Sequence, residues 1–167
     1  VLLAIFLVGS WGSISESVQL SFVPRDQAGL SAAGRIVNVE GRVRRKLVSD
    51  VLWFPADVGE AVFLGDGIET KREASSLIEL HELARIHLKI GAETIVKMRT
   101  FMKKPLILLL EGEVEVSGET PESVYVSTGL KMEKIQVRKG SSTKVRRTRD
   151  GDLDVKTAKT DVENEQG

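Results

Sequence analysis

The stretch LILLLEGEVEV, residues 106–116, decides the fold class. In its second half valines alternate with glutamates, so the pleat of a β-strand places the valines on one face and the glutamates on the other. Its first half is an unbroken aliphatic run, which predicts a strand that is covered on both faces at the centre of the core. Gly112 stands between the two halves, where a strand bends or another backbone approaches closely. The stretch predicts an all-β protein with one long strand over 106–116.

The same two-residue period continues on both sides of this stretch. In residues 85–90, Ile86, Leu88 and Ile90 alternate with basic or imidazole side chains, which predicts a strand with one face in water. Gly, Asp, Pro and Ser separate such runs. We expect strands at residues 35–39, 42–48, 51–54, 61–63, 67–70, 76–81, 85–90, 94–99, 106–116, 123–127, 133–138, 143–149 and 153–157. This pattern predicts a compact stack of short antiparallel strands, either a sandwich or a short β-solenoid.

A tight hairpin is expected near the end of the chain. The pair Asp150-Gly151 favours the positive φ angles of a two-residue turn. Such a turn would place Arg149 opposite Asp152 and Arg147 opposite Asp154, and these charge pairs would fix the register.

Length and composition limit the chain to one core-bearing domain with two appendages. It has 167 residues, 24 basic and 24 acidic side chains and no cysteine, which excludes disulfides, thiolate chemistry and a general attraction to nucleic acid. We expect an apolar signal or anchor segment at 1–18, a linker at 19–34, the β domain at 35–158 and a disordered acidic tail at 159–167. The uncharged run VLLAIFLVG, residues 1–9, favours a cleaved signal or a membrane anchor, with a buried N-terminal element as the alternative.

Reactive groups are sparse in the sequence. His81 and His87 could lie on adjacent strands and bind zinc, but basic neighbours make a surface role for His87 the better interpretation. Asp66 with Glu69 lacks the several oxygens that a calcium site needs. The row Glu111, Glu113 and Glu115 resembles a solvated strand face, with a paired-carboxylate hydrolase as the alternative. We therefore expect no catalytic residues, no metal and no cofactor.

Basic residues gather between Lys131 and Arg149. They are Lys131, Lys134, Arg138, Lys139, Lys144, Arg146, Arg147 and Arg149, against the single acid Glu133. The cluster could meet phosphates, anionic glycans or lipid head groups. It contains no aromatic residue of the kind that stacks on single-stranded nucleic acid. A solvated strand edge, on which Lys and Arg prevent aggregation, is the favoured interpretation.

Several motifs resemble the FecR-type domain, which is named for a regulator of iron-dicitrate transport. The first strand carries VEGRV at 39–43, the block FLGDGIET follows at 63–70, and the later strand carries LLEGEVEV at 109–116. The residues that carry the likeness are Gly41, Val43, Gly65, Asp66, Gly67, Ile68, Thr70, Gly112, Val114 and Val116. The segment HELA at 81–84 departs from the family pattern, because it provides no glycine for the turn.

The block at 63–70 also has a physical interpretation of its own. Gly65 and Gly67 flank Asp66 where the backbone is expected to need positive φ, and the Asp66 carboxylate can accept hydrogen bonds from nearby amides. This predicts a structural role for the three residues.

The resemblance implies a non-catalytic periplasmic module without a cofactor, anchored in the inner membrane or secreted by a signal peptide. In signalling members it implies relay between an outer-membrane receptor and a sigma-regulatory system. We therefore expect signal relay by contact of sheet edges or loops with another envelope protein. We expect no nucleic acid to be bound and the membrane to be met only through the N-terminal segment. The alternative is an envelope-structural or glycan-binding module, for which Trp53 and Phe54 are the candidate aromatic platform.

Overall fold

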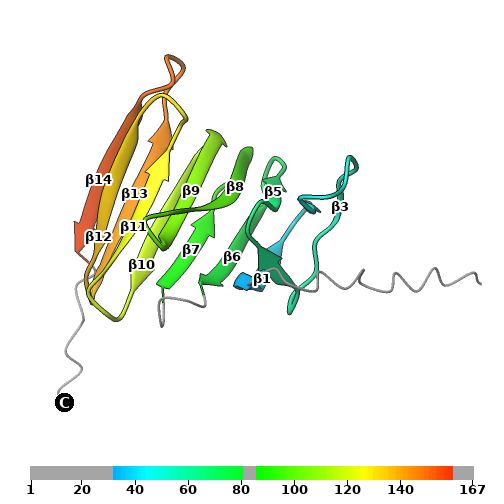
Figure 1. Cartoon of the computed structure of the whole chain (residues 1–167), viewed down its shortest axis with the longest axis horizontal. Helices are drawn as coiled ribbons and strands as arrows, with labels where there is room; N and C mark the ends of the chain where they lie inside the picture. Colours follow the sequence, from blue (N-terminus) through cyan, green and yellow to red (C-terminus); the bar gives the residue numbers. More distant parts are fainter. Residues whose placement is uncertain (1–31, 81–85, 160–167) are drawn as a thin grey trace, which may run out of the picture.

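In the computed structural model (Figure 1), the described residues form two seven-stranded sheets. The structure describes residues 32–80 and 86–159. Sheet A has the order β14-β13-β10-β7-β6-β1-β4, and sheet B has the order β12-β11-β9-β8-β5-β2-β3. The strands are β1 (Ala32–Glu40), β2 (Val43–Lys46), β3 (Phe54–Pro55), β4 (Ala61–Phe63), β5 (Gly67–Thr70), β6 (Ser75–Leu80), β7 (Ile86–Ile90), β8 (Thr94–Phe101), β9 (Lys104–Glu111), β10 (Glu113–Gly118), β11 (Glu122–Ser127), β12 (Met132–Val137), β13 (Ser141–Arg147) and β14 (Leu153–Lys159). The all-β prediction is confirmed.

The chain fills both sheets progressively from one end to the other. Strands early in the sequence lie at one end of each sheet and the last strands lie at the other end, so the colours of Figure 1 run from cyan to red across the molecule. Hairpins alternate between the sheets, with β6 and β7 in sheet A, β8 and β9 in sheet B, and β13 and β14 in sheet A. Neighbouring strands are antiparallel except for the parallel pair β9 and β11. The fold is thus a sandwich in which the chain advances in one direction along both sheets.

The core lies between the sheets and is aliphatic. Ile86, Leu88 and Ile90 of β7 are fully buried, as the alternation predicts, and Val114 and Val116 of β10 lie beside them. The partner face of sheet B contributes residues such as Val96, Met98, Ile107 and Leu109. Branched aliphatic side chains on alternate positions therefore hold the two sheets together.

The single strand predicted over 106–116 is two strands in different sheets. β9 ends at Glu111 in sheet B and β10 begins at Glu113 in sheet A. Gly112 forms the corner with φ +82°, and a Cβ at this position would lie 2.2 Å from Thr94 Oγ1. The prediction was wrong because both halves have the sequence of a β-strand, and neither pattern shows where the chain passes from one sheet to the other.

The aliphatic run at the start of this stretch is covered on one face only. Ile107 and Leu109 are fully buried, whereas Leu106, Leu108 and Leu110 are half-buried on the outer face of sheet B. Phe101 and Tyr125 lie on the same outer face, with ring centroids 5.1 Å apart at an interplanar angle of 72°. Neighbouring side chains of sheet B take the place of the expected second layer. β9 is therefore an interior strand of its sheet that is not covered on both faces.

The last hairpin has a longer turn than the sequence predicted. Gly151 has φ +83°, its N–H donates to the Thr148 carbonyl at 3.0 Å, and the Thr148 N–H donates to the Asp152 carbonyl at 2.9 Å. These are the bonds of a type I turn followed by a bulge at glycine. The register therefore pairs Arg146 with Asp154 and Arg147 with Leu153, one position away from our prediction.

The boundaries of the β domain differ slightly from the predicted ones. β1 begins at Ala32, within the segment expected to be linker, and β14 ends at Lys159, the first residue of the predicted tail. The signal or anchor at 1–18, the acidic residues after 159 and the glycine-free segment at 81–84 lie outside the described residues. No helix in the described part of the chain is long and apolar enough to cross a bilayer.

Candidate functional site

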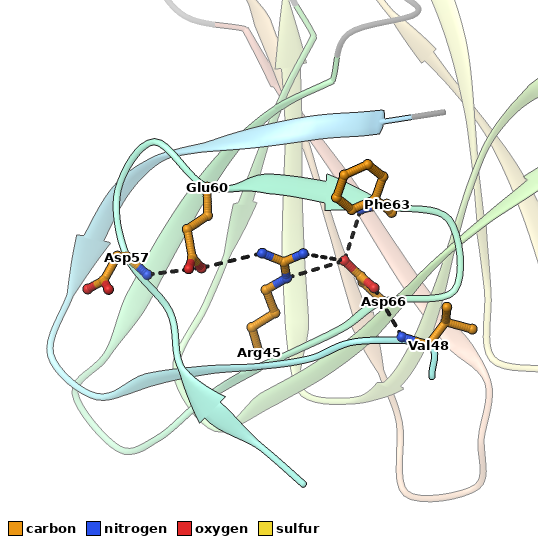
Figure 2. A network of polar contacts seen from close by, with 6 residues as sticks. All are labelled: Arg45, Val48, Asp57, Glu60, Phe63 and Asp66. Atoms are coloured by element: carbon orange, nitrogen blue, oxygen red, sulfur yellow. Dashed lines mark hydrogen bonds and ion pairs between the residues drawn. The ribbon is translucent and has the colours of Figure 1, made fainter. Parts of the chain in front are cut away.

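A buried ion pair lies at the centre of the block at residues 63–70. Asp66 is fully buried, and one of its carboxylate oxygens accepts from Arg45 Nη2 at 3.0 Å, from Arg45 Nε at 3.2 Å and from the Phe63 N–H at 3.0 Å (Figure 2). The other oxygen accepts from the Val48 N–H at 3.2 Å. Asp66 therefore holds the end of β4 and the segment after β2 in place, through its ion pair with Arg45 and its hydrogen bonds from two backbone amides.

The arginine of this pair is also largely enclosed. The Arg45 side chain is 12% exposed, and its Nη1 atom lies 3.5 Å from Glu60 Oε2 at the rim of the network. Glu60 in turn accepts from the Asp57 N–H at 3.3 Å (Figure 2). A buried carboxylate whose lone pairs are already taken by a cation and by amides has little capacity for a metal ion.

Glu69, the other proposed cation ligand, is similarly occupied. Arg44 Nε donates to one of its oxygens and Lys71 Nζ to the other, each at 2.6 Å. Burial raises the pKa of Glu69, but the hydrogen bonds from Lys71 and Arg44 outweigh burial and hold the pKa below its usual range. No group of three or more His, Cys, Asp or Glu that could hold a metal ion occurs in residues 32–80 and 86–159.

Thr70 connects the block to the corner at Gly112. Its hydroxyl contacts the Gly91 carbonyl and accepts from the Thr94 N–H at 3.1 Å. The Thr94 hydroxyl then accepts from the Glu113 N–H at 3.0 Å. These two buried threonines form hydrogen bonds with backbone groups where the chain passes from one sheet to the other. The block at 63–70 and the corner at Gly112 are therefore linked by hydrogen bonds.

The remaining residues of the FecR-like pattern have distinct places in the fold. Gly65 has φ +95°, as predicted for the turn. Gly67 has no positive φ, and this expectation was wrong: the residue lies in β5, where a Cβ would be 3.1 Å from the Trp53 ring. Gly41 has φ +69° in the turn after β1. The side chains of Val43, Ile68, Val114 and Val116 are buried in the core.

The other candidate sites separate in space. His87 lies on the outer face of sheet A opposite Glu79 and Ser117, and His81 lies outside the described residues. Trp53 packs against Gly67 and lies 5.8 Å from the Arg44 guanidinium. One face of the proposed aromatic platform is thus occupied by the protein itself.

The basic stretch is divided between both sheets. Lys144 and Arg146 lie on the outer face of sheet A at 2.6 and 3.3 Å from Glu113, whose pKa is lowered chiefly by the Lys144 hydrogen bond. Arg147 points inward and donates to the Leu110 carbonyl at 2.8 Å. Lys134 lies on β12, an edge strand of sheet B, in agreement with the solvated-edge interpretation. A shallow depression beside Glu113 is lined by Lys144, Arg146, Asp154 and Lys156, whose charges largely compensate one another.

The feature that sequence reasoning missed is the contrast between the sheet edges. At the end formed by early strands the edges are β3, with two residues including Pro55, and β4, with three residues. At the other end they are β12, with six residues, and β14, with seven. Short, proline-containing edges resist pairing with other chains, whereas long ones present an unpaired row of N–H and C=O groups. The long edges are thus the candidate functional site.

Hydrogen bonds at the strand ends define which backbone groups face outward along these edges. The Thr128 N–H donates to the Lys131 carbonyl at 2.9 Å, so these two residues form a hydrogen-bonded pair of the ladder. Bonded and non-bonded pairs alternate along antiparallel strands, so the N–H and C=O groups of Met132, Lys134 and Gln136 point away from β11. The Arg147 N–H donates to the Gly112 carbonyl at 3.0 Å, which directs the backbone of Arg146 and Lys144 toward β14. The backbone groups of Leu153, Val155 and Thr157 consequently face the open side of β14.

No protein-family model, curated protein or solved structure matches this chain. The FecR-type resemblance therefore stays a prediction that rests on the quoted motifs.

Proposed function

We propose that this chain is a non-catalytic FecR-type module of the periplasm that relays a signal by binding another envelope protein through a long sheet edge. The observation that carries the proposal is the length and exposure of β12 and β14, at the opposite end from the short edges β3 and β4. An extended segment of a partner can continue such a sheet with backbone hydrogen bonds while its side chains provide specificity.

β12 is the edge that we assign to the partner protein. The backbone groups of Met132, Lys134 and Gln136 are directed to the open side, and the side chains of these residues are exposed on the outer face of sheet B. A bound strand with an acidic side chain opposite Lys134 and an apolar one near Met132 would complement this edge. An outer-membrane receptor or a component of a sigma-regulatory system is the kind of partner that the resemblance implies.

Membrane attachment or secretion through residues 1–18 belongs to the same proposal. It rests on the uncharged apolar run at 1–9. It would place the β domain on the outer side of the inner membrane, within reach of envelope partners.

A photocrosslinking experiment in intact envelopes tests the β12 assignment. With the crosslinker at Gln136, we expect a defined adduct with one envelope protein. The Lys134→Pro variant removes only an N–H that faces the open side, so it should keep the fold and lose the adduct. Glu133→Pro is the matched control, since its N–H faces β11, and it should destabilise the fold itself.

Two outcomes would contradict the proposal. One is an adduct that persists in a folded Lys134→Pro variant. The other is the absence of any protein adduct together with binding of an envelope glycan that Trp53→Ala abolishes, which would favour the alternative of a glycan-binding module.

A further inference from the structure

The second long edge, β14, has the pattern of a strand that pairs with a copy of itself. Two rows of side chains cross sheet A and end at this strand, one on the inner face and one on the outer face. A second copy of β14 could extend both rows with suitable side chains.

The inner row is aliphatic and incomplete. Ile90, Val114, Val145 and Val155 are successive cross-strand neighbours over β7, β10, β13 and β14. The first three are at most 1% exposed, whereas Val155 is 40% exposed. Val155 is therefore the last member of a core row, and one more apolar neighbour would cover it.

The outer row has a charge mismatch at the edge. Glu115 of β10 lies opposite Lys144 of β13, and Lys144 lies opposite Lys156 of β14. Like charges directly opposite one another are unfavourable across a sheet. Lys156 contacts Asp154 of its own strand at 3.3 Å, but its open side has no acidic strand neighbour within the described part of sheet A.

The backbone phase limits the possible self-pairing registers, and the side chains favour one of them. The N–H and C=O groups of Leu153, Val155 and Thr157 face the open side, so bonded pairs with another strand form at these residues. An antiparallel copy related by a two-fold axis at Val155 pairs Val155 with Val155 of the second copy, and Leu153 with its Thr157. The same register sets Asp154 opposite Lys156 of the second copy, and Lys156 opposite its Asp154.

We propose that β14 pairs with β14 of a second copy of this chain about a two-fold axis at Val155, so that sheet A becomes continuous across a homodimer. This register completes the valine row on the inner face and places an acid beside each Lys156 on the outer face. Centring the axis on Lys156 instead would set two lysines directly opposite one another, and centring it on Asp154 would do the same with two aspartates. The self-complementarity is that of an isologous two-fold interface.

This inference deepens the proposed function, since it assigns one long edge to a second copy and leaves β12 for the partner protein. The two are separable. Association of the purified chain tests β14 alone, and the envelope crosslink at Gln136 tests β12 alone.

Single cysteines provide the test of register, because the chain has none of its own. In a bonded antiparallel pair the two Cα atoms are about 5.5 Å apart, within the range of about 4.4 to 6.8 Å that disulfides span. We expect the full-length Val155→Cys variant to form a disulfide-linked dimer under mild oxidation. Thr157→Cys, on the same strand and face, should stay largely monomeric because its counterpart lies opposite Leu153.

Charge exchange provides a second test, read by sedimentation of the full chain over a concentration series. Asp154→Lys and Lys156→Asp should each weaken self-association at least tenfold, since each sets like charges opposite one another. An equimolar mixture of the two variants should regain association as a heterodimer, because every cross-copy pair then joins an acid and a base.

Three outcomes would overturn the inference. They are equal crosslinking yields for Val155→Cys and Thr157→Cys, a mixture that associates no better than its components, and a wild-type chain that stays monomeric at every concentration reached. Far-ultraviolet circular dichroism of each variant confirms that the sheets are intact before the results are compared.

Discussion

At the scale of single residues, Asp66 shows how this fold uses a buried charge. Its carboxylate is fully buried, and both its oxygens are occupied by Arg45 and by two backbone amides. Removing one member of such a pair leaves the other charge uncompensated in a medium of low dielectric constant. The residue is thus an essential part of the structure at the β2 and β4 ends of the sandwich.

We predict that Asp66→Ala lowers the free energy of unfolding by about 3 kcal/mol or more. Glu60→Ala is the control, since Glu60 is more than a third exposed and lies 3.5 Å from the same arginine; its loss should cost no more than about 1 kcal/mol. Urea denaturation of both variants measures the difference. Equal losses would show that the pair contributes no more than a surface contact.

The sequence predicted the kind of role that Asp66 has but not its main partner. A short polar side chain between two glycines indicates hydrogen bonding to nearby amides, and the Phe63 and Val48 amides provide these bonds. Arg45 lies 21 positions earlier, and only the register of β2 with β5 brings it to Asp66. The local periodicity of the sequence does not show which distant residues are brought together in this way.

At the scale of elements, the corner at Gly112 determines which sheet each half of the central stretch joins. Its φ of +82° is unfavourable for residues with a Cβ, and an added Cβ would also meet Glu93 O at 2.7 Å and Thr94 Oγ1 at 2.2 Å. The hydrogen bonds of Thr70 and Thr94, which join β5, β8 and β10, would have to shift to make room.

We predict that Gly112→Ala lowers the free energy of unfolding by more than about 2 kcal/mol, from backbone strain together with the collision. Gly129→Ala is the matched control, because Gly129 also has positive φ, at +88°, but no atom lies within 4 Å of an added Cβ. It should cost only about 1 kcal/mol. Thermal unfolding of the two variants separates strain from crowding, and an equal shift would refute the role of the corner.

The strands themselves were predictable from the sequence where one face is exposed to solvent. Residues 61–63 and 67–70 form strands with the predicted bounds, and most other strands differ by a few residues at one or both ends. Alternation reports which side chains share a face, so the buried set of β7 and β10 followed directly from it. It does not report which sheet a strand joins, and it cannot show a corner such as Gly112 or the one-residue register difference made by the bulge at Gly151.

At the scale of the whole molecule, the candidate site is a property of topology and not of any motif. Strand order places the shortest strands at one end of both sheets and β12 and β14 at the other. A sequence pattern describes β14 as a strand but does not show that, among the described strands, it has a neighbour on one side only. The long edges therefore became visible only with the sheet order, whereas the aliphatic rows that build the core were visible in the sequence.

Carboxylates on the outer faces of the two sheets couple the stability of the whole molecule to pH. The pKa values of Glu69 in sheet B and Glu113 in sheet A both lie below the ordinary value of 4.5, because basic neighbours stabilise the charged form. A lowered pKa in the folded state contributes stability that is fully present above the unfolded pKa and is lost as pH falls through the folded pKa. The free energy of unfolding should therefore decrease steadily as pH drops below about 4.5.

We predict that the double variant Glu69→Gln with Glu113→Gln is less stable at pH 7 and loses less stability between pH 7 and pH 3 than the wild-type chain does. Lys144→Gln tests the cause at one site, since it removes the hydrogen bond that most lowers the Glu113 pKa and should remove part of the same pH dependence. Urea denaturation at several pH values measures the slope for each chain. Identical slopes in the wild-type chain and the double variant would show that the acid sensitivity of the sandwich originates in other carboxylates, and that the ion pairs on the two outer faces contribute little to holding it together.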